Sequence, residues 1–325
     1  MHMTLRRTAA FIDLGSVKIE VKEIPLSLRE SYLGGRGIDI YLMYTMLKPD
    51  LDPWDPGNLL LIGAGILSGT PAPSAAGMIH VGGKLPLTGL AGSLSMGGFW
   101  GAELRFAGFD HLVITGKSSR PVYLWVHNRE IEIRDAAPFW NADSLAVQDL
   151  IRDISDEENA QVMSVGKPGG DRGAPMDLRT DGEHCREAAE LGMLMLSKNL
   201  KAVAVRGTLP VEIKNPDKAL QHLAELIDLF RLSAAVTGIS SSPEELMRTG
   251  ERIVTLERLF DIREGFSLAD DGLFAYRHRR LPEFSPLLKP ALARYNEIHG
   301  WDMHGRPQPD TLKRLGLDGE LHRLL

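Results

Sequence analysis

Residues 111–133 read HLVITGKSSRPVYLWVHNREIEI, and three strand-like runs with turn residues between them fill this stretch. The first two runs, residues 111–115 and 122–126, are rich in branched and aromatic side chains, which favour strands. The third, residues 130–133, alternates charged and apolar residues, as a strand does when one of its faces meets solvent. This part of the chain is therefore predicted to be sheet.

Similar strand signals occur on both sides of this stretch. Strands are expected at residues 17–22, 59–62, 78–81, 162–165 and 202–205. Helices are expected between them, at residues 144–154 and 186–200. The 33 glycines and 19 prolines indicate many tight turns. The mixture predicts the α+β class with a large, mainly antiparallel sheet system.

The character of the sequence changes near Ile213, where strand signals end and helical ones begin. Ser242-Pro243-Glu244-Glu245 has the form of a capped helix start, with serine before proline and glutamate three residues after the serine. Four apolar residues then share one helical face: Leu246, Ile253, Leu256 and Phe260. Further helices are expected at residues 289–299 and 310–315. We therefore predict two regions, residues 1–212 and a helical tail of residues 213–325.

Composition excludes several classes of function. The 325 residues carry a net charge of -6, which argues against nucleic-acid binding because phosphate neutralisation needs an excess of Lys and Arg. The most apolar run, residues 59–67, is about half as long as a membrane span, so no membrane association is expected. The single cysteine, Cys185, cannot form an internal disulfide or a four-cysteine cluster site, and it fits a reduced, cytoplasmic location.

Short motifs alone identify no mechanism. Gly34-Gly35-Arg36-Gly37 could cradle a phosphate, but no strand precedes it and its spacing is not that of a dinucleotide fingerprint, so a plain turn is favoured. The ten histidines show no metal-binding spacing, and no metal site is predicted. His80 lies within a predicted strand, where a histidine is commonly a structural residue.

Longer stretches of the chain resemble the tungsten-containing aldehyde:ferredoxin oxidoreductases. The resemblance rests on these segments, in the family's order: residues 32–37, 52–53, 67–70, 86–89, 97–110, 197–201, 250–253, 256–260, 263–266 and 300–302. They cover the family's amino-terminal domain and its carboxy-terminal segment. The resemblance implies a two-sheet base domain, on which the family's tungsten–bis-pterin cofactor rests, followed here by a short helical tail.

The resemblance also implies that two helical domains of the family are largely missing. In the family they clamp the cofactor, bind a four-iron cluster through cysteines and carry acid–base residues. Between about Asn215 and Leu232 this chain passes directly from the base domain to the family's last helices. The 4Fe–4S cluster is therefore expected to be absent.

Residues that face the pterin phosphates in the family also differ. Met78 stands where the family usually has an arginine, and Ser95 stands where an asparagine helps to hold magnesium. Glu187 to Glu190 replace a glycine-rich phosphate loop that contains an arginine. Carboxylates near phosphates repel them by about 1 kcal/mol or more for each close pair. Neither the tungsten–bis-pterin nor any other cofactor is therefore expected.

These differences suggest a cofactor-free enzyme that uses the vacated cavity for acid–base chemistry on a small organic substrate. Cyclisation, isomerisation and elimination are candidate reactions. Its candidate catalytic residues are His80, His184, Glu187 and Glu190. Other former pterin-facing positions that could line the pocket are Arg36, Met78, Lys84, Ser93, Ser95 and Arg186. The structural alternative is that these polar residues only solvate a former interface.

Two further hypotheses remain, so the sequence leaves open whether the protein is an enzyme. It could be a non-catalytic subunit, with the apolar residues Leu94, Met96, Phe99 and Trp100 at an interface in a homodimer or with a partner chain. It could instead be an oxidoreductase subunit that still binds a tungsten or molybdenum pterin, with the missing domains supplied by another polypeptide.

Overall fold

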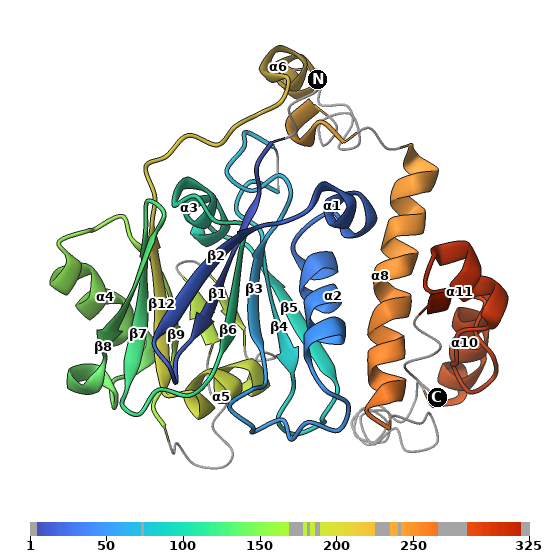
Figure 1. Cartoon of the computed structure of the whole chain (residues 1–325), viewed down its shortest axis with the longest axis horizontal. Helices are drawn as coiled ribbons and strands as arrows, with labels where there is room; N and C mark the ends of the chain where they lie inside the picture. Colours follow the sequence, from blue (N-terminus) through green and yellow to red (C-terminus); the bar gives the residue numbers. More distant parts are fainter. Residues whose placement is uncertain are drawn as a thin grey trace.

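The computed structural model describes residues 5–72, 75–168, 178–180, 183–185, 189–224, 235–239, 242–265 and 285–319. Two six-stranded sheets pack face to face, and helices cover the outer face of the first sheet (Figure 1). The two sheets and the helical tail confirm the predicted α+β class.

The first sheet has the strand order β2-β1-β6-β3-β4-β5. Its strands are β1 (Thr8–Asp13), β2 (Lys18–Glu23), β3 (Leu60–Ala64), β4 (Ile79–Lys84), β5 (Ala91–Met96) and β6 (His111–Thr115). All neighbours are antiparallel except β1 and β6, which are parallel.

The second sheet has the order β11-β10-β9-β12-β7-β8. Its strands are β7 (Val122–His127), β8 (Glu130–Asp135), β9 (Gln161–Val165), β10 (Leu178–Thr180), β11 (Glu183–Cys185) and β12 (Leu200–Arg206). Only β7 and β12 pair in parallel among the described strands of this sheet. The prediction of mainly antiparallel sheets is therefore confirmed.

Strand β3 shows how the layers are built, because successive side chains of a strand point to opposite faces. Leu60 and Ile62 belong to the core between the two sheets, together with Trp100 of α3 (Trp100–Phe106). Leu61 belongs to a second core on the opposite face, which α2 (Arg36–Met46) covers. The other helices of the base domain are α1 (Leu26–Tyr32), α4 (Ser144–Ser155), α5 (Ala189–Ser197) and the short 3-10 helix η1 (Ala137–Phe139).

The tail adds an outer layer on this second core. Helix α8 (Pro243–Arg263) begins with the predicted capping box at Ser242 and runs beside α2 (Figure 1). Leu256 and Phe260 are buried against α2, as their helical spacing predicted, while Leu246 and Ile253 are half-buried. Each fully buried side chain of this size contributes about 1.5–3 kcal/mol. The described part of the tail also contains α6 (Pro216–Ala224), α10 (Ser285–Ile298) and α11 (Pro309–Leu315).

One predicted helix differs in extent. The sequence predicts one helix over residues 186–200, but α5 (Ala189–Ser197) ends three residues earlier, and β12 starts at Leu200. Residues 186–188 lie outside the described residues. Among the described segments, no helix is both long and apolar enough to traverse a bilayer.

Candidate active site

A buried carboxylate lies between two imidazoles on the face of the first sheet that α2 covers. Asp39 of α2 contacts His80 of β4, with 2.7 Å between Oδ2 and Nδ1. It contacts His111 of β6 in the same way, with 2.8 Å between Oδ1 and Nδ1. Asp39 and His111 are each 1% exposed and His80 is 6% exposed. The three side chains therefore form one cluster that is almost completely shielded from solvent.

The register of the first sheet places His80 and His111 directly on either side of one residue of β3. Gly63 of β3 pairs with His80 on one side and with His111 on the other. A methyl group at position 63 would lie 2.7 Å from Asp39 Oδ2 and 2.6 Å from His111 Cε1. Gly63 therefore leaves the space that the Asp39 carboxylate occupies between the two rings.

The cluster favours an ionised Asp39 and a fixed orientation of both rings. Burial alone would raise the pKa of Asp39, but the charges and hydrogen bonds of His111 and His80 outweigh it and lower the pKa. Because the carboxylate accepts a hydrogen bond from each Nδ1, each neutral ring carries its lone pair on Nε2. His80 Nε2 is buried and has no hydrogen-bond partner among the described residues.

A cavity of about 100 Å³ adjoins His80. It has room for about three water molecules or a small organic group. It lies between α2, the first sheet and α8, and its wall consists of Arg36, Asp39, Ile40, Met43, Leu61, His80, Gly82, Ala91, Gly92, Ser93, Glu257 and Asp261.

Helix α8 contributes two carboxylates to this cavity. Burial raises the pKa of Asp261 to about 7, although the backbone N–H of Ala91 donates a hydrogen bond to this carboxyl group. Asp261 is therefore partly protonated near neutral pH and can donate a proton. Glu257 accepts two hydrogen bonds from the Arg36 guanidinium, a pair that joins α8 to the start of α2. His80, whose Nε2 has no partner among the described residues, and the titratable Asp261 therefore line the same cavity.

The structure brings together three of the residues singled out from the sequence: His80, Arg36 and Ser93 line the same cavity. Lys84 is placed differently. Its ammonium group forms a buried ion pair with Glu264, directly after α8, and donates to the carbonyl of Leu51 at 2.7 Å. Lys84 therefore attaches the tail to the sheet.

The remaining predicted residues lie outside this cavity or outside the described residues. Met78 is half-buried, and its carbonyl accepts hydrogen bonds from Gly65 N and Ser68 Oγ. Ser95 is exposed on β5. Glu190, at the start of α5, accepts a hydrogen bond from the backbone N–H of Leu87 at 2.9 Å and so holds a loop.

His184 lies in β11, but its side chain is not described. Arg186 and Glu187 lie outside the described residues. The expected i, i+3 pairing of Glu187 with Glu190 therefore remains a prediction.

Sequence patterns did not identify Asp39, His111, Glu257 and Asp261 as site residues. A signal existed for the first two, because a carboxylate in an apolar helix and a histidine in an apolar strand both require buried partners. The two histidines lie beside Asp39 because of the register in which β3 pairs with β4 and β6. The spacing of residues along the sequence does not show this register.

Comparisons with known proteins match both regions of the chain. Residues 9–207 match the family described as aldehyde ferredoxin oxidoreductase, N-terminal domain. Residues 213–317 match that described as aldehyde ferredoxin oxidoreductase, domains 2 and 3.

Individual relatives agree with these matches. A tungsten-containing aldehyde ferredoxin oxidoreductase of Pyrococcus furiosus is 36% identical over 220 residues, which are 68% of this chain and 36% of the relative. An aliphatic sulfonate oxidoreductase, WOR-like subunit, of the same organism is 30% identical, over 66% of this chain and 37% of the relative. This chain thus spans about a third of the length of the relatives it matches.

A solved structure shares the fold. It is the active-site complex BamBC of benzoyl coenzyme A reductase with 1,5-dienoyl-CoA, and it superposes with a TM-score of 0.64 at 31% identity. The match covers 70% of this chain and 35% of that one.

Proposed function

Because this chain belongs to the aldehyde ferredoxin oxidoreductase family, and because its cavity is small and rich in acid–base groups, we propose that it is a cofactor-free enzyme of that family. The proposed reaction is a non-redox proton transfer on a small organic substrate, as in an isomerisation or an elimination. The observation that carries the proposal is the buried, unpartnered Nε2 of His80 beside a cavity, with Asp39 fixing the ring.

The residues at this position do not fit a tungsten–bis-pterin. The cavity beside Arg36, His80 and Ser93 is about 100 Å³, too small for two pterins with their phosphates. Glu257 and Asp261 of α8 also line it, and carboxylates repel phosphates. The chain has one cysteine, whereas a four-iron cluster requires four thiolates. Neither group takes part in the proposed reaction.

In the proposed reaction His80 is the base, Asp261 is the acid, and Asp39 and His111 orient and stabilise the base. His80 Nε2 accepts a proton from the substrate, and the Asp39 carboxylate stabilises the imidazolium that forms. His111 holds the other oxygen of Asp39 and so keeps the carboxylate in place. Asp261, with its pKa near 7, supplies a proton to a different atom of the substrate or to its leaving group. The substrate loses one proton to His80, and Asp261 returns one to the substrate or to its leaving group. The substrate therefore undergoes no net oxidation.

The hypothesis of a non-catalytic subunit has less support in the structure. It predicts an apolar surface formed by Leu94, Met96, Phe99 and Trp100. Met96 and Trp100 are buried in the core between the sheets, and Leu94 is half-buried. Phe99 alone of the four is an exposed large side chain, at 71%. One exposed aromatic residue is a small surface for a stable interface.

Metal analysis tests the loss of cofactor. We expect protein that is purified without oxygen, from cells supplied with tungstate and molybdate, to contain far less than one atom of tungsten, molybdenum or iron per chain. The measurement is inductively coupled plasma mass spectrometry, with a full-length tungsten enzyme of the family prepared in parallel as the control. About one tungsten or molybdenum per chain would contradict the proposal and favour the hypothesis of a subunit that retains a pterin.

Proton exchange tests the proposed chemistry on compounds whose products need not be identified. A panel of small carbonyl compounds is incubated with the enzyme in D₂O, and deuterium incorporation is followed by proton NMR. We expect His80→Gln to slow the exchange by about 10²-fold or more, the usual size of a general acid–base contribution. The control is His304→Gln, because the His304 side chain is exposed and does not line the cavity. Equal rates in wild type and His80→Gln on every exchanging compound would refute the assignment.

The pH profile adds a second readout. Asp261 must be protonated to act as the acid, so the turnover of a compound that needs this acid should fall as pH rises through about 7. In Asp261→Asn the turnover should no longer fall as the pH rises through about 7, and its maximal rate should be lower than that of the wild type.

A further inference from the structure

The charges on the wall of the cavity beside His80 limit which substrates it can accept. A cavity of about 150 Å³ holds the ring of benzene, so a cavity of about 100 Å³ accommodates about four non-hydrogen atoms. Three carboxyl groups belong to its wall, those of Asp39, Glu257 and Asp261. Arg36 is the one arginine or lysine among the described residues that line it. An anionic substrate would therefore depend on Arg36 as its counter-ion.

Arg36 is already paired with another residue of the same wall. Its Nε and Nη2 donate hydrogen bonds to the two carboxylate oxygens of Glu257, so the ion pair is bidentate. These hydrogen bonds raise the pKa of Arg36, because they stabilise the charged guanidinium. The charges of the two side chains cancel, and both forks of the guanidinium are occupied. Arg36 is therefore not free to bind an anion while Glu257 is present.

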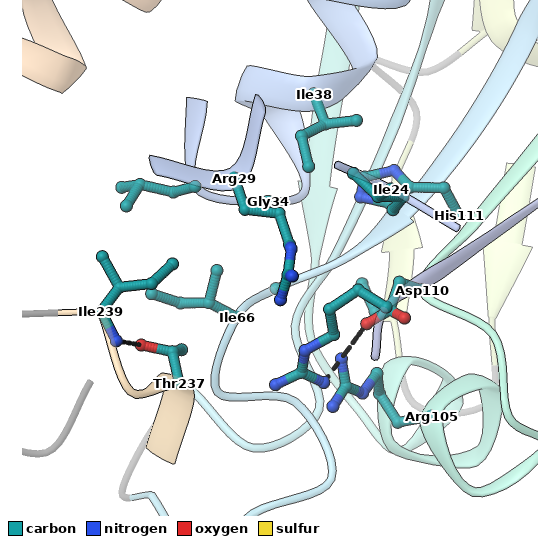
Figure 2. A pocket seen from close by; sticks show the side chains of 14 residues that line it. Ile24, Arg29, Gly34, Ile38, Ile66, Arg105, Asp110, His111, Thr237 and Ile239 are labelled. Carbon is teal, nitrogen blue, oxygen red and sulfur yellow. Dashed lines mark hydrogen bonds and ion pairs between the residues drawn. The ribbon is translucent and has the colours of Figure 1, made fainter. Parts of the chain in front are cut away.

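Other buried arginines do not replace Arg36 in this cavity. Arg7, Arg29 and Arg105 line a different cavity of about 30 Å³, which His111 also lines (Figure 2). Arg105 forms an ion pair with Asp110, and Arg7 lies 3.3 Å from the same carboxylate oxygen. None of these three arginines lines the proposed active-site cavity. Within the described part of the chain, that cavity therefore has no lysine or arginine available as a counter-ion.

The other carboxyl groups of the wall make the cavity unfavourable for an anion. Asp39 is ionised, because the two histidines outweigh the effect of burial on its pKa. Burial raises the pKa of Asp261 to about 7, so this group is partly ionised near neutral pH. An anion in the cavity would be repelled by these charges and would lose its hydration without gaining a cation. An uncharged molecule of the same size meets neither penalty.

We propose that the substrate of this site is a small uncharged carbonyl compound, and that Glu257 excludes anions by occupying Arg36. The inference rests on the proposed function, because it takes this cavity to be the substrate site. A carbonyl group makes the neighbouring C–H acidic enough for a base such as His80 to remove its proton. Its oxygen can accept a hydrogen bond from the protonated form of Asp261.

Probes of equal shape and different charge test this selectivity on the full chain. Acetate, acetamide and acetamidinium share one planar shape and are anionic, neutral and cationic. Their binding is measured near neutral pH and at constant ionic strength by isothermal calorimetry and ligand-observed NMR. We expect acetamide to bind at least about 10-fold more tightly than acetate, and acetamidinium to bind no more weakly than acetamide. Acetate binding as tightly as acetamide would overturn the proposal, and so would the absence of saturable acetamide binding.

A variant of Glu257 tests which residue sets the selectivity. Glu257→Gln keeps the shape of the side chain but removes the charge that neutralises Arg36. Acetate should then bind at least about 10-fold more tightly than to the wild type, and adding Arg36→Met should abolish this gain. Glu251→Gln is the matched control, because Glu251 lies on the same helix, forms a similar bidentate pair with Arg314 and does not line the cavity. Unchanged acetate affinity in Glu257→Gln would refute the role of Glu257.

These measurements can fail independently of the proposed function, because binding does not require turnover. If His80→Gln slows proton exchange while acetate and acetamide bind equally, the proposed function stands and the inference about charge is wrong. If acetamide is preferred but exchange does not depend on His80, the selectivity stands and the assignment of the base is wrong. Should Glu257→Gln fail to fold, the three probes on the wild type still decide whether anions are excluded.

Discussion

Replacing Asp39 with asparagine is expected to lower the rate of proton exchange by about 10³-fold or more. The reason is the tautomer of His80. Asp39 accepts from Nδ1 of both histidines, whereas an asparagine amide accepts on one side and donates on the other. The ring that faces the NH₂ group must then carry its proton on Nε2. If this ring is His80, it loses the lone pair at its reacting nitrogen. In either orientation of the amide, His80 loses the carboxylate that stabilises its imidazolium, and the serine protease triad shows that such a change removes most of the activity.

The measurement pairs the exchange rate with ¹⁵N NMR of the imidazole nitrogens. In wild type both neutral rings should be protonated at Nδ1, and in Asp39→Asn at least one should change to Nε2. Asp149→Asn is the matched control, because Asp149 is exposed on α4, where it pairs with Arg152. An Asp39→Asn protein with wild-type exchange and unchanged tautomers would show that the cluster is purely structural.

Replacing Lys84 with methionine is expected to destabilise the fold by about 3–5 kcal/mol. The Lys84 and Glu264 side chains are 4% and 1% exposed. Removing the lysine leaves a buried carboxylate that retains Arg263 Nε at 3.1 Å and the backbone N–H of Asp50 as partners. A loss near the lower end of that range, about 3 kcal/mol, is therefore expected. Lys84→Met combined with Glu264→Gln also removes the buried negative charge that has lost its lysine and should recover part of the loss.

Urea unfolding of the two single variants and the double variant gives the coupling energy. Lys22→Met serves as the control, because the Lys22–Glu20 pair is about half exposed and such pairs contribute at most about 1 kcal/mol. A Lys84→Met protein as stable as Lys22→Met would mean that the pair does not attach the tail.

Features encoded by neighbouring residues were predictable from the sequence. The alternation in residues 130–133 predicted β8, and Ser242-Pro243-Glu244-Glu245 predicted the start of α8. The end of α5 was misplaced, because the sequence predicted a helix as far as residue 200, whereas the helix ends at Ser197, Asn199 has a φ of 58° and β12 starts at Leu200.

The candidate site was only partly predictable, because long-range pairing creates it. His80 was found from its place in a family pattern, but its partner Asp39 lies 41 residues away, and His111 lies 72 residues from Asp39. Lys84 was expected to face the pocket. It contacts Glu264 because the tail lies directly on the sheet, an arrangement that depends on how α8 packs against α2.

The attachment of α8 also affects how the protein is made. Lys84 and its partner Glu264 are 180 residues apart in the chain. At a synthesis rate of about 5–20 residues per second, roughly 10–40 s pass between the emergence of the two residues from the ribosome. During that time α2 can pack on the outer face of the first sheet, but α8 cannot. Lys84 then lacks its partner Glu264, and the residues of α8 that line the cavity beside Asp39 are absent. Until α8 has been translated, apolar side chains of this core, such as Leu61 and Met43, therefore lack the contacts of α8, and the nascent chain is then most prone to aggregate.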